Sequence, residues 1–489
     1  MKPIDLCLLL TAYSFVATAL LAGLAFQSRR YSHWLVLAAA AAILAVSVVT
    51  GYYVEPGRGY PELVAAAIRR RDLSAVLAVA WGSMLAAATG SFMFLPQRSW
   101  DRAGFSTGLL GSVMALGVTF VACQAFFWTS AGYVTRQPPA YSLDPAFRVQ
   151  RIADLDYRPI RIIAAEGRVF VCYDYFEEAG DIGGSIVELF PDQPDRPPRV
   201  IADSPLLARC YGLAYHRGDL YVSRSGFWGR ADRGRIDYAG TGAVTRLSDL
   251  DGDGYFEFFD DVVKNLPGVR GPETMHQNNG LCFDAQGNLY VACASSANRA
   301  LDRHPWGGTV LKVSPDFQKI DVFVRGLRNP FAIICTADGH LLLTDNDVDE
   351  NPGDELLQLR QGAHYGHPYV LPKQDDRRND GFAKPLWISE GESNVQGFAH
   401  CDAATLPPRY RGGLFVADLL QERVLYFGLD TSGESIRVTH VQPLAVIPSP
   451  LDVAATPEGD LYVISRNSRK VYRISPVRRV RDPAGKEKP

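Results

Sequence analysis

Residues 326–344 read GLRNPFAIICTADGHLLLT, and an acidic segment, DNDVDENPGDE, follows at residues 345–355. Two apolar runs in the first segment flank Asp338-Gly339, a dipeptide that tolerates the positive φ angles of a tight type I′ turn. We therefore predict a β-hairpin with a two-residue link at this dipeptide. The Arg328-Asn329 pair before the hairpin and the acidic segment after it then lie at the same end of the two strands.

Hairpins of this kind recur along the rest of the chain. Each consists of a short apolar strand, a turn that contains glycine and a second apolar strand, and the copies span residues 160–172, 212–223, 280–293, 331–344, 397–418 and 451–464. Six such units fit six four-stranded blades, whereas a β-sandwich would not need six similar hairpins. The sequence therefore predicts an all-β six-bladed β-propeller over residues 148–478.

Long apolar runs are concentrated before the repeats. Four of them, at residues 6–26, 34–54, 74–95 and 106–129, reach the roughly 20 residues that a helix needs to cross a bilayer. Because three further spans follow the first, we predict an α-helical transmembrane anchor over residues 1–134, not a cleaved signal peptide. Consecutive prolines favour an extended linker at residues 135–147, and we expect the charged tail at residues 479–489 to be disordered.

Charge and cysteine content restrict the function classes. The chain carries 50 basic and 53 acidic residues, a balance that argues against a nucleic-acid partner. Around the predicted spans, six basic residues fall on the side of the two ends of the anchor and four on the other side, so the charge count by itself favours cytoplasmic ends. The eight cysteines show neither a CxxC metal spacing nor a haem-attachment CxxCH, and we predict that most are buried thiols.

A calcium-loop pattern lies at residues 249–260, which read DLDGDGYFEFFD. Oxygen ligands at loop positions one, three, five, nine and twelve, a backbone carbonyl at seven and glycine at six form the arrangement that Ca²⁺ requires. No helix pair of the EF-hand type flanks this loop, so we expect a structural calcium site inserted between two blades. The predicted ligands are Asp249, Asp251, Asp253, Tyr255, Glu257 and Asp260, the last in place of the usual glutamate.

The motifs around the central hairpin resemble those of the soluble glucose/sorbosone dehydrogenases. In order they are GLRNP, the Asp-Gly hairpin, TDN, GDEL and YGHPY, all within residues 326–369. This resemblance implies a six-bladed propeller that uses pyrroloquinoline quinone (PQQ) and calcium to oxidise a sugar or aldose. It covers nothing before about residue 140. Enzymes of this family act outside the cytoplasm, so it also implies a propeller on the periplasmic side of the cell membrane, with a quinone or cytochrome as candidate electron acceptor.

The resemblance assigns roles to single residues. His276 matches the catalytic base that takes the proton of the sugar C1 hydroxyl while hydride passes to the quinone, a role that suits neutral imidazole near pH 7. Arg328 and Asn329 match the pair that contacts the quinone, whose carboxylates suit a guanidinium fork and an amide. Gln277 and Asn346 complete the expected cofactor contacts.

Two calcium positions follow from the same resemblance. The segment 346–348 falls where backbone carbonyls of the family hold the active-site calcium, so Asp347 and Val348 are expected ligands, although the family usually has Gly-Pro there. The second position is a structural calcium site, which Asp354, Glu355 and Tyr365 match.

Several positions depart from the family pattern. Leu419-Leu420 stands where the family has a lysine, Ser449 and Leu451 stand where it has two arginines, and Ser295 replaces the aspartate that orients the histidine. An anionic cofactor buried without partners is costly, so Arg299, Arg303 or Arg423 would have to compensate. Two alternatives to a dehydrogenase therefore stay open: a calcium-dependent lactonase-like hydrolase that polarises a carbonyl at Asp347, and a non-catalytic propeller that binds carbohydrate or protein.

Overall fold

A computed structural model describes residues 140–174, 183–207, 210–225, 242–267, 276, 278–302, 304–346, 353–370, 381–390, 393–433 and 435–477. All of them belong to the compact unit Pro138–Pro489. The four predicted membrane spans and the predicted tail lie outside the described residues. Within the ranges given, no helix is long and apolar enough to cross a membrane.

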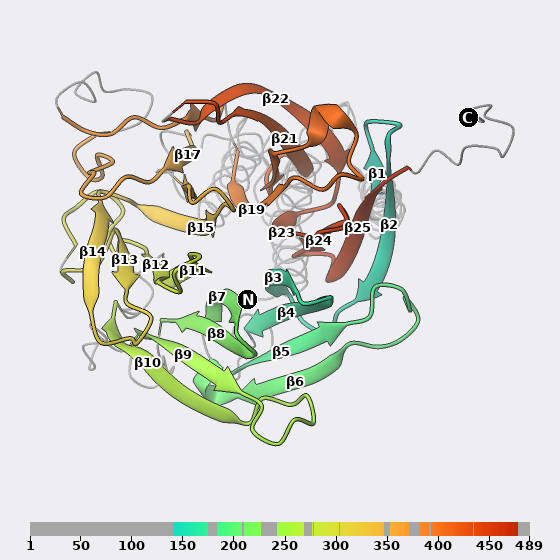
Figure 1. Cartoon of the computed structure of the whole chain (residues 1–489), viewed down its shortest axis with the longest axis horizontal. Coiled ribbons are helices and arrows are strands. Elements are labelled where there is room, and N and C mark those ends of the chain that lie inside the picture. Colours follow the sequence, from blue (N-terminus) through green and yellow to red (C-terminus); the bar gives the residue numbers. More distant parts are fainter. Residues whose placement is uncertain are drawn as a thin grey trace, which may run out of the picture. The chain divides into compact units, whose positions relative to one another are not determined.

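The described chain folds into six antiparallel sheets arranged as blades around a central axis (Figure 1). Blades 1 to 3 consist of β3 (Pro159–Ala165), β4 (Arg168–Asp174), β5 (Gly184–Leu189) and β6 (Arg199–Ser204); β7 (Cys210–His216), β8 (Asp219–Arg224), β9 (Gly242–Ser248) and β10 (Phe258–Leu266); and β11 (Asn278–Phe283), β12 (Leu289–Cys293), β13 (Thr309–Val313) and β14 (Ile320–Arg325).

Blades 4 to 6 follow the same order from the axis outward. They consist of β15 (Asn329–Cys335), β16 (Leu341–Asn346), β17 (Glu355–Gln358) and β18 (Trp387–Ile388); β19 (Val395–Cys401), β20 (Gly413–Asp418), β21 (Arg423–Asp430), β22 (Arg437–Val446) and β1 (Tyr141–Ser142); and β23 (Pro450–Ala455), β24 (Leu461–Ser465), β25 (Lys470–Pro476) and β2 (Phe147–Asp154). Two short 3₁₀ helices, η1 (Pro205–Leu207) and η5 (Pro408–Tyr410), also occur in the described part. The predicted six-bladed propeller is confirmed.

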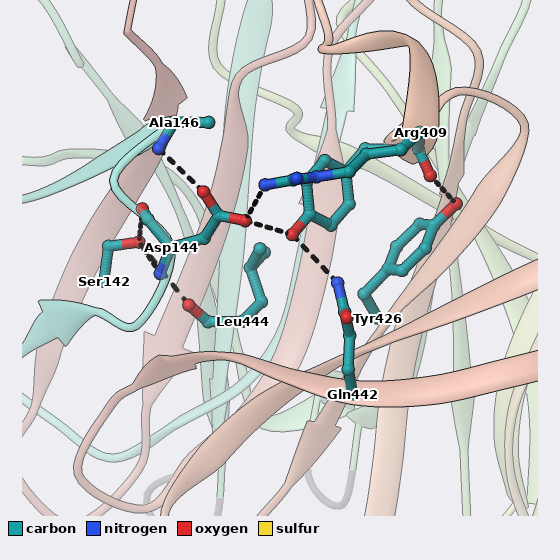
Figure 2. A network of polar contacts seen from close by, with 8 residues as sticks. Ser142, Asp144, Ala146, Arg409, Tyr426, Gln442 and Leu444 are labelled. Carbon is teal, nitrogen blue, oxygen red and sulfur yellow. Dashed lines mark hydrogen bonds and ion pairs between the residues drawn. The ribbon is translucent and has the colours of Figure 1, made fainter.

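The start of the described chain closes the ring of blades. Strand β2 pairs with β25 and so completes blade 6, while β1 adds a fifth strand to blade 5 by pairing with β22. Figure 2 shows how the segment between them is held: the Asp144 carboxylate accepts hydrogen bonds from Arg409, from the Tyr410 hydroxyl and from the Ala146 N–H. Gln442 in turn donates to the Tyr410 hydroxyl at 2.9 Å. This network holds the segment between β1 and β2 against blade 5.

The inner hairpins have turns of more than one type. Glu166-Gly167 and Arg217-Gly218 link their strands directly with positive φ at both residues, which is the type I′ geometry. The predicted two-residue link at Asp338-Gly339 is wrong. Only Gly339 has a positive φ there, and the connection runs over residues 336–340. The longer turn forms because the Thr336 hydroxyl donates to Asp338 and accepts the His340 N–H, so the side chain closes the loop.

Side chains link four inner strands across the axis. Arg161 of β3 is 4% exposed, and its guanidinium lies 3.8 Å from the ring centroid of Phe331 on β15 and 3.8 Å from the Asp452 carboxylate on β23. Its Nε also donates to the Tyr211 carbonyl of β7 at 2.5 Å. Gly397 is required beside this cluster, because a Cβ there would lie 1.7 Å from an Asp452 oxygen. The inner ends of the blades are therefore fixed relative to one another.

Candidate active site at the channel mouth

A polar site forms where inner strands β11, β15 and β19 begin, near the centre of Figure 1. His276 stands two residues before β11, and Arg328 stands one residue before β15. The antiparallel register of β15 and β16 places Asn329 opposite Asn346, so the end of β16 reaches the same place. Equivalent positions of neighbouring blades lie on one face of a propeller, which explains how residues 52 positions apart, 276 and 328, come together.

Four carboxamide side chains, which we call the amide belt, connect blades 3, 4 and 5 at this mouth. Asn279 donates to Asn329 Oδ1 at 3.1 Å, and Asn329 donates to Asn346 Oδ1 at 3.3 Å. Gln396 donates to the same Asn346 oxygen at 3.0 Å. Asn279, Asn346 and Gln396 are buried. Because each amide orients the next one, the belt presents a fixed set of donors and acceptors.

Arg328 is held rigidly beside the belt. Its Nε and Nη2 donate to Asn298 Oδ1 at 3.0 and 2.7 Å, and its Nη1 donates to the Asn346 carbonyl at 3.0 Å. The Asp345 carboxylate accepts the backbone N–H groups of Arg328 and Asn329 at 3.0 and 2.7 Å. The side chain is 4% exposed. A buried guanidinium in this setting is preorganised for an anionic or carbonyl-bearing ligand.

His276 is oriented by the backbone of Ser295. The His276 Nδ1 lies 2.8 Å from the Ser295 carbonyl oxygen, which can only accept, so we assign the proton to Nδ1 and the basic lone pair to Nε2. The Ser295 N–H donates to the Arg328 carbonyl at 2.8 Å, so one residue connects the two candidate site residues. Burial, and then the charge of Arg328, lower the pKa of His276 to about 4. The imidazole is therefore neutral at pH 7 and can accept a proton.

Ser295 stands where the family pattern has an aspartate, and the structure shows which group orients His276 in its place. A backbone carbonyl supplies the acceptor that the aspartate would supply, while the Ser295 hydroxyl donates to the Ala297 carbonyl at 3.1 Å. A carbonyl dipole stabilises an imidazolium less than a carboxylate does. The hydrogen bond to the Ser295 carbonyl favours the protonated ring of His276, but burial and the charge of Arg328 outweigh it and lower the pKa.

Sequence reasoning missed five contributors to the site: Asn279, Ser295 as a carbonyl acceptor, Asn298, His367 and Gln396. Burial, and then the charge of Arg328, lower the pKa of His367 to about 4. The His-Gln-Asn-Asn-Gly run signals the polar character of Asn279, and the histidine of Tyr-Gly-His-Pro-Tyr signals His367. Nothing in the sequence marks Asn298 or Gln396, since both reach the site through loop and blade geometry.

The predicted calcium loop joins β9 to β10 within blade 2, so the expectation that it lies between two blades is wrong. It brings some of its predicted ligands together. Carboxylate oxygens of Asp249, Asp251 and Glu257 lie within 4.8 Å of one another. Asp253 accepts the Tyr255 N–H at 2.7 Å, whereas Asp260 lies on β10 and pairs with Arg246 at 3.1 Å. The first three residues therefore form the compact part of the predicted site, and Asp260 is engaged elsewhere.

The second predicted calcium position lies between blades 4 and 5. Asp354 accepts the Val395 N–H at 2.7 Å, and the Tyr365 hydroxyl donates to the Gln358 carbonyl at 2.6 Å. Both Asp354 and Glu355 are buried. Two nearby buried oxygens, Ser389 Oγ and Asn394 Oδ1, have no hydrogen-bond partner among the described residues. Hydroxyl, amide and carboxylate oxygens are the donor types that Ca²⁺ takes, so this set fits the ion.

Three predicted site residues, Gln277, Asp347 and Val348, lie outside the described residues, as does Arg303. Among the other proposed compensating cations, Arg299 is exposed, and Arg423 pairs with the buried Asp418 at 3.0 Å. The six cysteines that the structure describes are thiols outside any disulfide, and most of them are buried, as expected.

Comparison with known proteins gives one family match and several structures with the same fold. The family model described as glucose / sorbosone dehydrogenase matches residues 221–473. No curated protein matches the chain. Among solved structures, an oxidoreductase (glucose dehydrogenase) from Thermus thermophilus is similar with 20% identity and a TM-score of 0.51, over 67% of this chain and 99% of that one.

Two further solved structures share the fold. The PQQ-bound aldose sugar dehydrogenase of Streptomyces coelicolor is 18% identical, with a TM-score of 0.52 over 69% of this chain and 99% of that one. The holo PQQ domain of a pyranose dehydrogenase from Coprinopsis cinerea is 13% identical, with a TM-score of 0.52 over 69% and 98%. At these identities the likeness concerns the fold, while the family match covers more than half of the sequence. The chain belongs to the glucose/sorbosone dehydrogenase family.

Proposed function

We propose that the protein is a sugar or aldose dehydrogenase-like oxidoreductase that uses PQQ and calcium and is tethered to the membrane by its N-terminal region. The observation that carries this proposal is the meeting of His276, Arg328 and Asn329 at one channel mouth, with the Ser295 backbone between the first two. A base and a rigid anion-binding group side by side are what oxidation of an alcohol with an anionic cofactor requires.

The residues at the mouth fit PQQ as a ligand. A buried guanidinium and the amide belt are suitable donors for carboxylate and quinone oxygens, so Arg328, Asn329 and Asn346 would hold the cofactor together with Gln277. When bound, the quinone supplies the acceptor for a hydride from C1 of the sugar. The protein's own part is to hold the C1 hydroxyl near His276 Nε2, to accept its proton there and to exclude water.

Calcium has two proposed roles. Asp347 and Val348 would bind the active-site ion next to Asn346, where it would act as a Lewis acid. The loop at residues 249–260 and the group around Asp354, Glu355 and Tyr365 would bind structural ions.

A non-catalytic carbohydrate-binding propeller is the second candidate, because Leu419, Ser449 and Leu451 replace three cations of the family pattern. Titration of the purified full chain with PQQ, followed by absorbance, separates the two functions. The dehydrogenase proposal predicts saturable binding that Arg328→Met weakens by at least about tenfold, the equivalent of one charged hydrogen bond. Absence of PQQ binding in wild type would favour the second candidate, whereas lactone hydrolysis without PQQ would favour the lactonase-like alternative.

The proposed location is the cell membrane, with the propeller on the periplasmic side. Support comes from the four apolar runs before residue 130 and from the site of action implied by the family, although the basic residues near the runs favour the opposite orientation by six to four. Fusion of alkaline phosphatase after residue 140 should give an active reporter. An inactive phosphatase together with an active cytoplasmic reporter at the same position would reverse the orientation.

A further inference from the structure

One loop of blade 3 is attached to the segment that carries Arg328. It joins β12 to β13 over residues 294–308, and backbone hydrogen bonds hold it near both of its ends. The Ser295 N–H donates to the Arg328 carbonyl at 2.8 Å, and the Leu327 N–H donates to the Gly308 carbonyl at 3.1 Å. Because the loop is joined to this segment at two points, a side chain on the loop has a fixed place relative to Arg328.

The middle of the loop is ordered by a carboxylate. Ser296 donates to Asp302 through its N–H at 2.5 Å and through its hydroxyl at 3.0 Å, and the His304 N–H donates to the same carboxylate at 3.0 Å. Gly307 is required beside it, because a Cβ there would lie 2.1 Å from the Asp302 carboxyl carbon. Asn298 therefore belongs to a closed, hydrogen-bonded loop, although the residue itself is exposed.

The exposed Asn298 side chain contacts a buried cation. Its Oδ1 accepts hydrogen bonds from Arg328 Nε at 3.0 Å and from Arg328 Nη2 at 2.7 Å, along one edge of the guanidinium. From the blade 4 side, the Asn346 carbonyl accepts Nη1 at 3.0 Å. Contacts from two blades to different parts of the planar group fix its orientation, which one contact alone would leave free to rotate.

The acceptor at position 298 carries no charge. An aspartate of nearly the same shape could accept the same two N–H groups, but it would add a negative charge beside the guanidinium. Such a charge would oppose the binding of an anion next to Arg328. Asparagine supplies the orienting contact without this electrostatic cost.

We propose that Asn298 is a positioning residue that orients the Arg328 guanidinium toward an anionic ligand group without adding a negative charge to the site. The inference rests on the proposed function for the identity of the ligand, PQQ with its carboxylates. It deepens that function by naming a residue that sets both the orientation of the cation and the preference of the site for an anion.

Two variants of similar size separate orientation from charge. Asn298→Leu removes the acceptor, whereas Asn298→Asp keeps an acceptor in the same place and adds a charge. Both replace an exposed loop side chain, so the fold should be retained, and thermal unfolding checks this. Gln318→Leu, at an exposed position in the turn between β13 and β14, is the matched control for the loss of a surface amide.

Two readouts on the full chain need no cofactor. The Arg328 Nε–H, assigned by NMR with Arg328→Met, should exchange with water at least about tenfold faster in Asn298→Leu, as expected for loss of a charged hydrogen bond, and at the wild-type rate in Asn298→Asp. The titration midpoint of His276 should move to higher pH in Asn298→Asp, because the new carboxylate counteracts the guanidinium charge that helps to lower this pKa. Gln318→Leu should match wild type in both readouts.

Absorbance titration with PQQ is the third readout. Affinity should fall at least about tenfold in both Asn298 variants, through lost orientation in one and through added charge in the other, and should be unchanged in Gln318→Leu. A wild type that binds no PQQ would contradict the proposed function, while the two cofactor-free readouts would still decide the role of Asn298. Wild-type exchange of the Arg328 Nε–H in Asn298→Leu, an unchanged His276 midpoint in Asn298→Asp, or wild-type PQQ affinity in either variant would overturn the proposal.

Discussion

At the scale of single residues, the geometry of the candidate site depends on how His276 and Arg328 share the backbone of Ser295. The carbonyl of Ser295 fixes the His276 tautomer, and its N–H fixes the Arg328 carbonyl. The proximity of the guanidinium has an electrostatic consequence. Its charge opposes protonation of the imidazole, in addition to the larger effect of burial.

This arrangement predicts an unusually acidic titration of His276. Its pKa is lowered to about 4, so the neutral, basic form persists above that pH and is lost as pH falls through it. Arg328→Met removes the nearby charge and should move the midpoint to higher pH. Histidine NMR of the full chain measures both midpoints, with the His276 signal assigned by His276→Gln. Arg148→Met, at an exposed position on β2, is the control and should leave the His276 midpoint unchanged. A wild-type midpoint near 6.5, or an unchanged midpoint in Arg328→Met, would contradict this electrostatic account.

A site residue could be predicted from the sequence where its side chain makes the contact, and could not be predicted where its backbone does. His276, Arg328, Asn329 and Asn346 carry recognisable side-chain chemistry in recognisable motifs, and the structure brings them together. The contribution of Ser295 comes from its backbone, whose partners are set by the path of the chain. Residue type therefore carried no signal for that contribution.

At the scale of elements, the six inner hairpins were predictable because alternation of apolar strands with glycine turns is a local signal. The lengths of the turns were harder to predict from the sequence. At Asp338-Gly339, the hydroxyl of Thr336 stabilises a longer connection, which competes with the type I′ turn that the dipeptide favours. The pairing of β1 with β22 was not predictable either, since residues 141 and 446 are brought together only by closure of the ring.

The Asp144 network should stabilise this closure in a pH-dependent way. Burial by itself would raise the pKa of Asp144, but hydrogen bonds from Tyr410, Ala146 and Arg409 outweigh it and hold the pKa below its usual value. A carboxyl with a lowered pKa contributes stability above its unfolded-state value of about 3.9, and this is lost as pH falls through the folded-state pKa. Asp144→Ala should cost about 1.5–3 kcal/mol at pH 7.

Chemical denaturation at pH 7 and at pH 3 measures this contribution. The difference between wild type and Asp144→Ala should shrink at the lower pH. Asp154→Ala is the matched control, because it breaks an ion pair with Arg151 in which both side chains are more than half exposed, and such pairs contribute little. Equal losses of unfolding free energy in the two variants at pH 7 would show that the network does not stabilise the segment between β1 and β2.

The loop at residues 249–260 should bind Ca²⁺ and stabilise the propeller. Ligand that binds only the folded state adds roughly 2.7 kcal/mol at a hundredfold excess over Kd. Chelation should therefore lower the melting temperature of wild type. Asp251→Asn combined with Glu257→Gln should reduce this shift, whereas Asp321→Ala, at an exposed position on β14, should leave it unchanged. A full calcium-dependent shift in the double variant would point to the group around Asp354 instead.

At the scale of the whole molecule, the propeller serves as a frame that brings three blades to one mouth. Repetition in the sequence predicted this frame, and the links of Arg161 across the axis explain how it holds the inner strands in place. The family's cations in the last two blades are replaced here, and the described residues place Arg423 on Asp418. The proposed function therefore requires that Arg328 and the amide belt hold the proposed cofactor without these cations.

Turnover with a reconstituted cofactor answers that question most directly. The purified full chain is incubated with PQQ and Ca²⁺, and oxidation of a panel of aldoses is followed with an artificial electron acceptor. We predict oxidation by wild type and a loss of about 10²- to 10⁴-fold in turnover for His276→Ala at saturating cofactor, as expected for removal of a general base. Binding of PQQ should be retained in that variant. A wild type that oxidises no aldose under these conditions, or a His276→Ala variant that turns over as fast as wild type, would contradict the assignment of this site as a dehydrogenase centre.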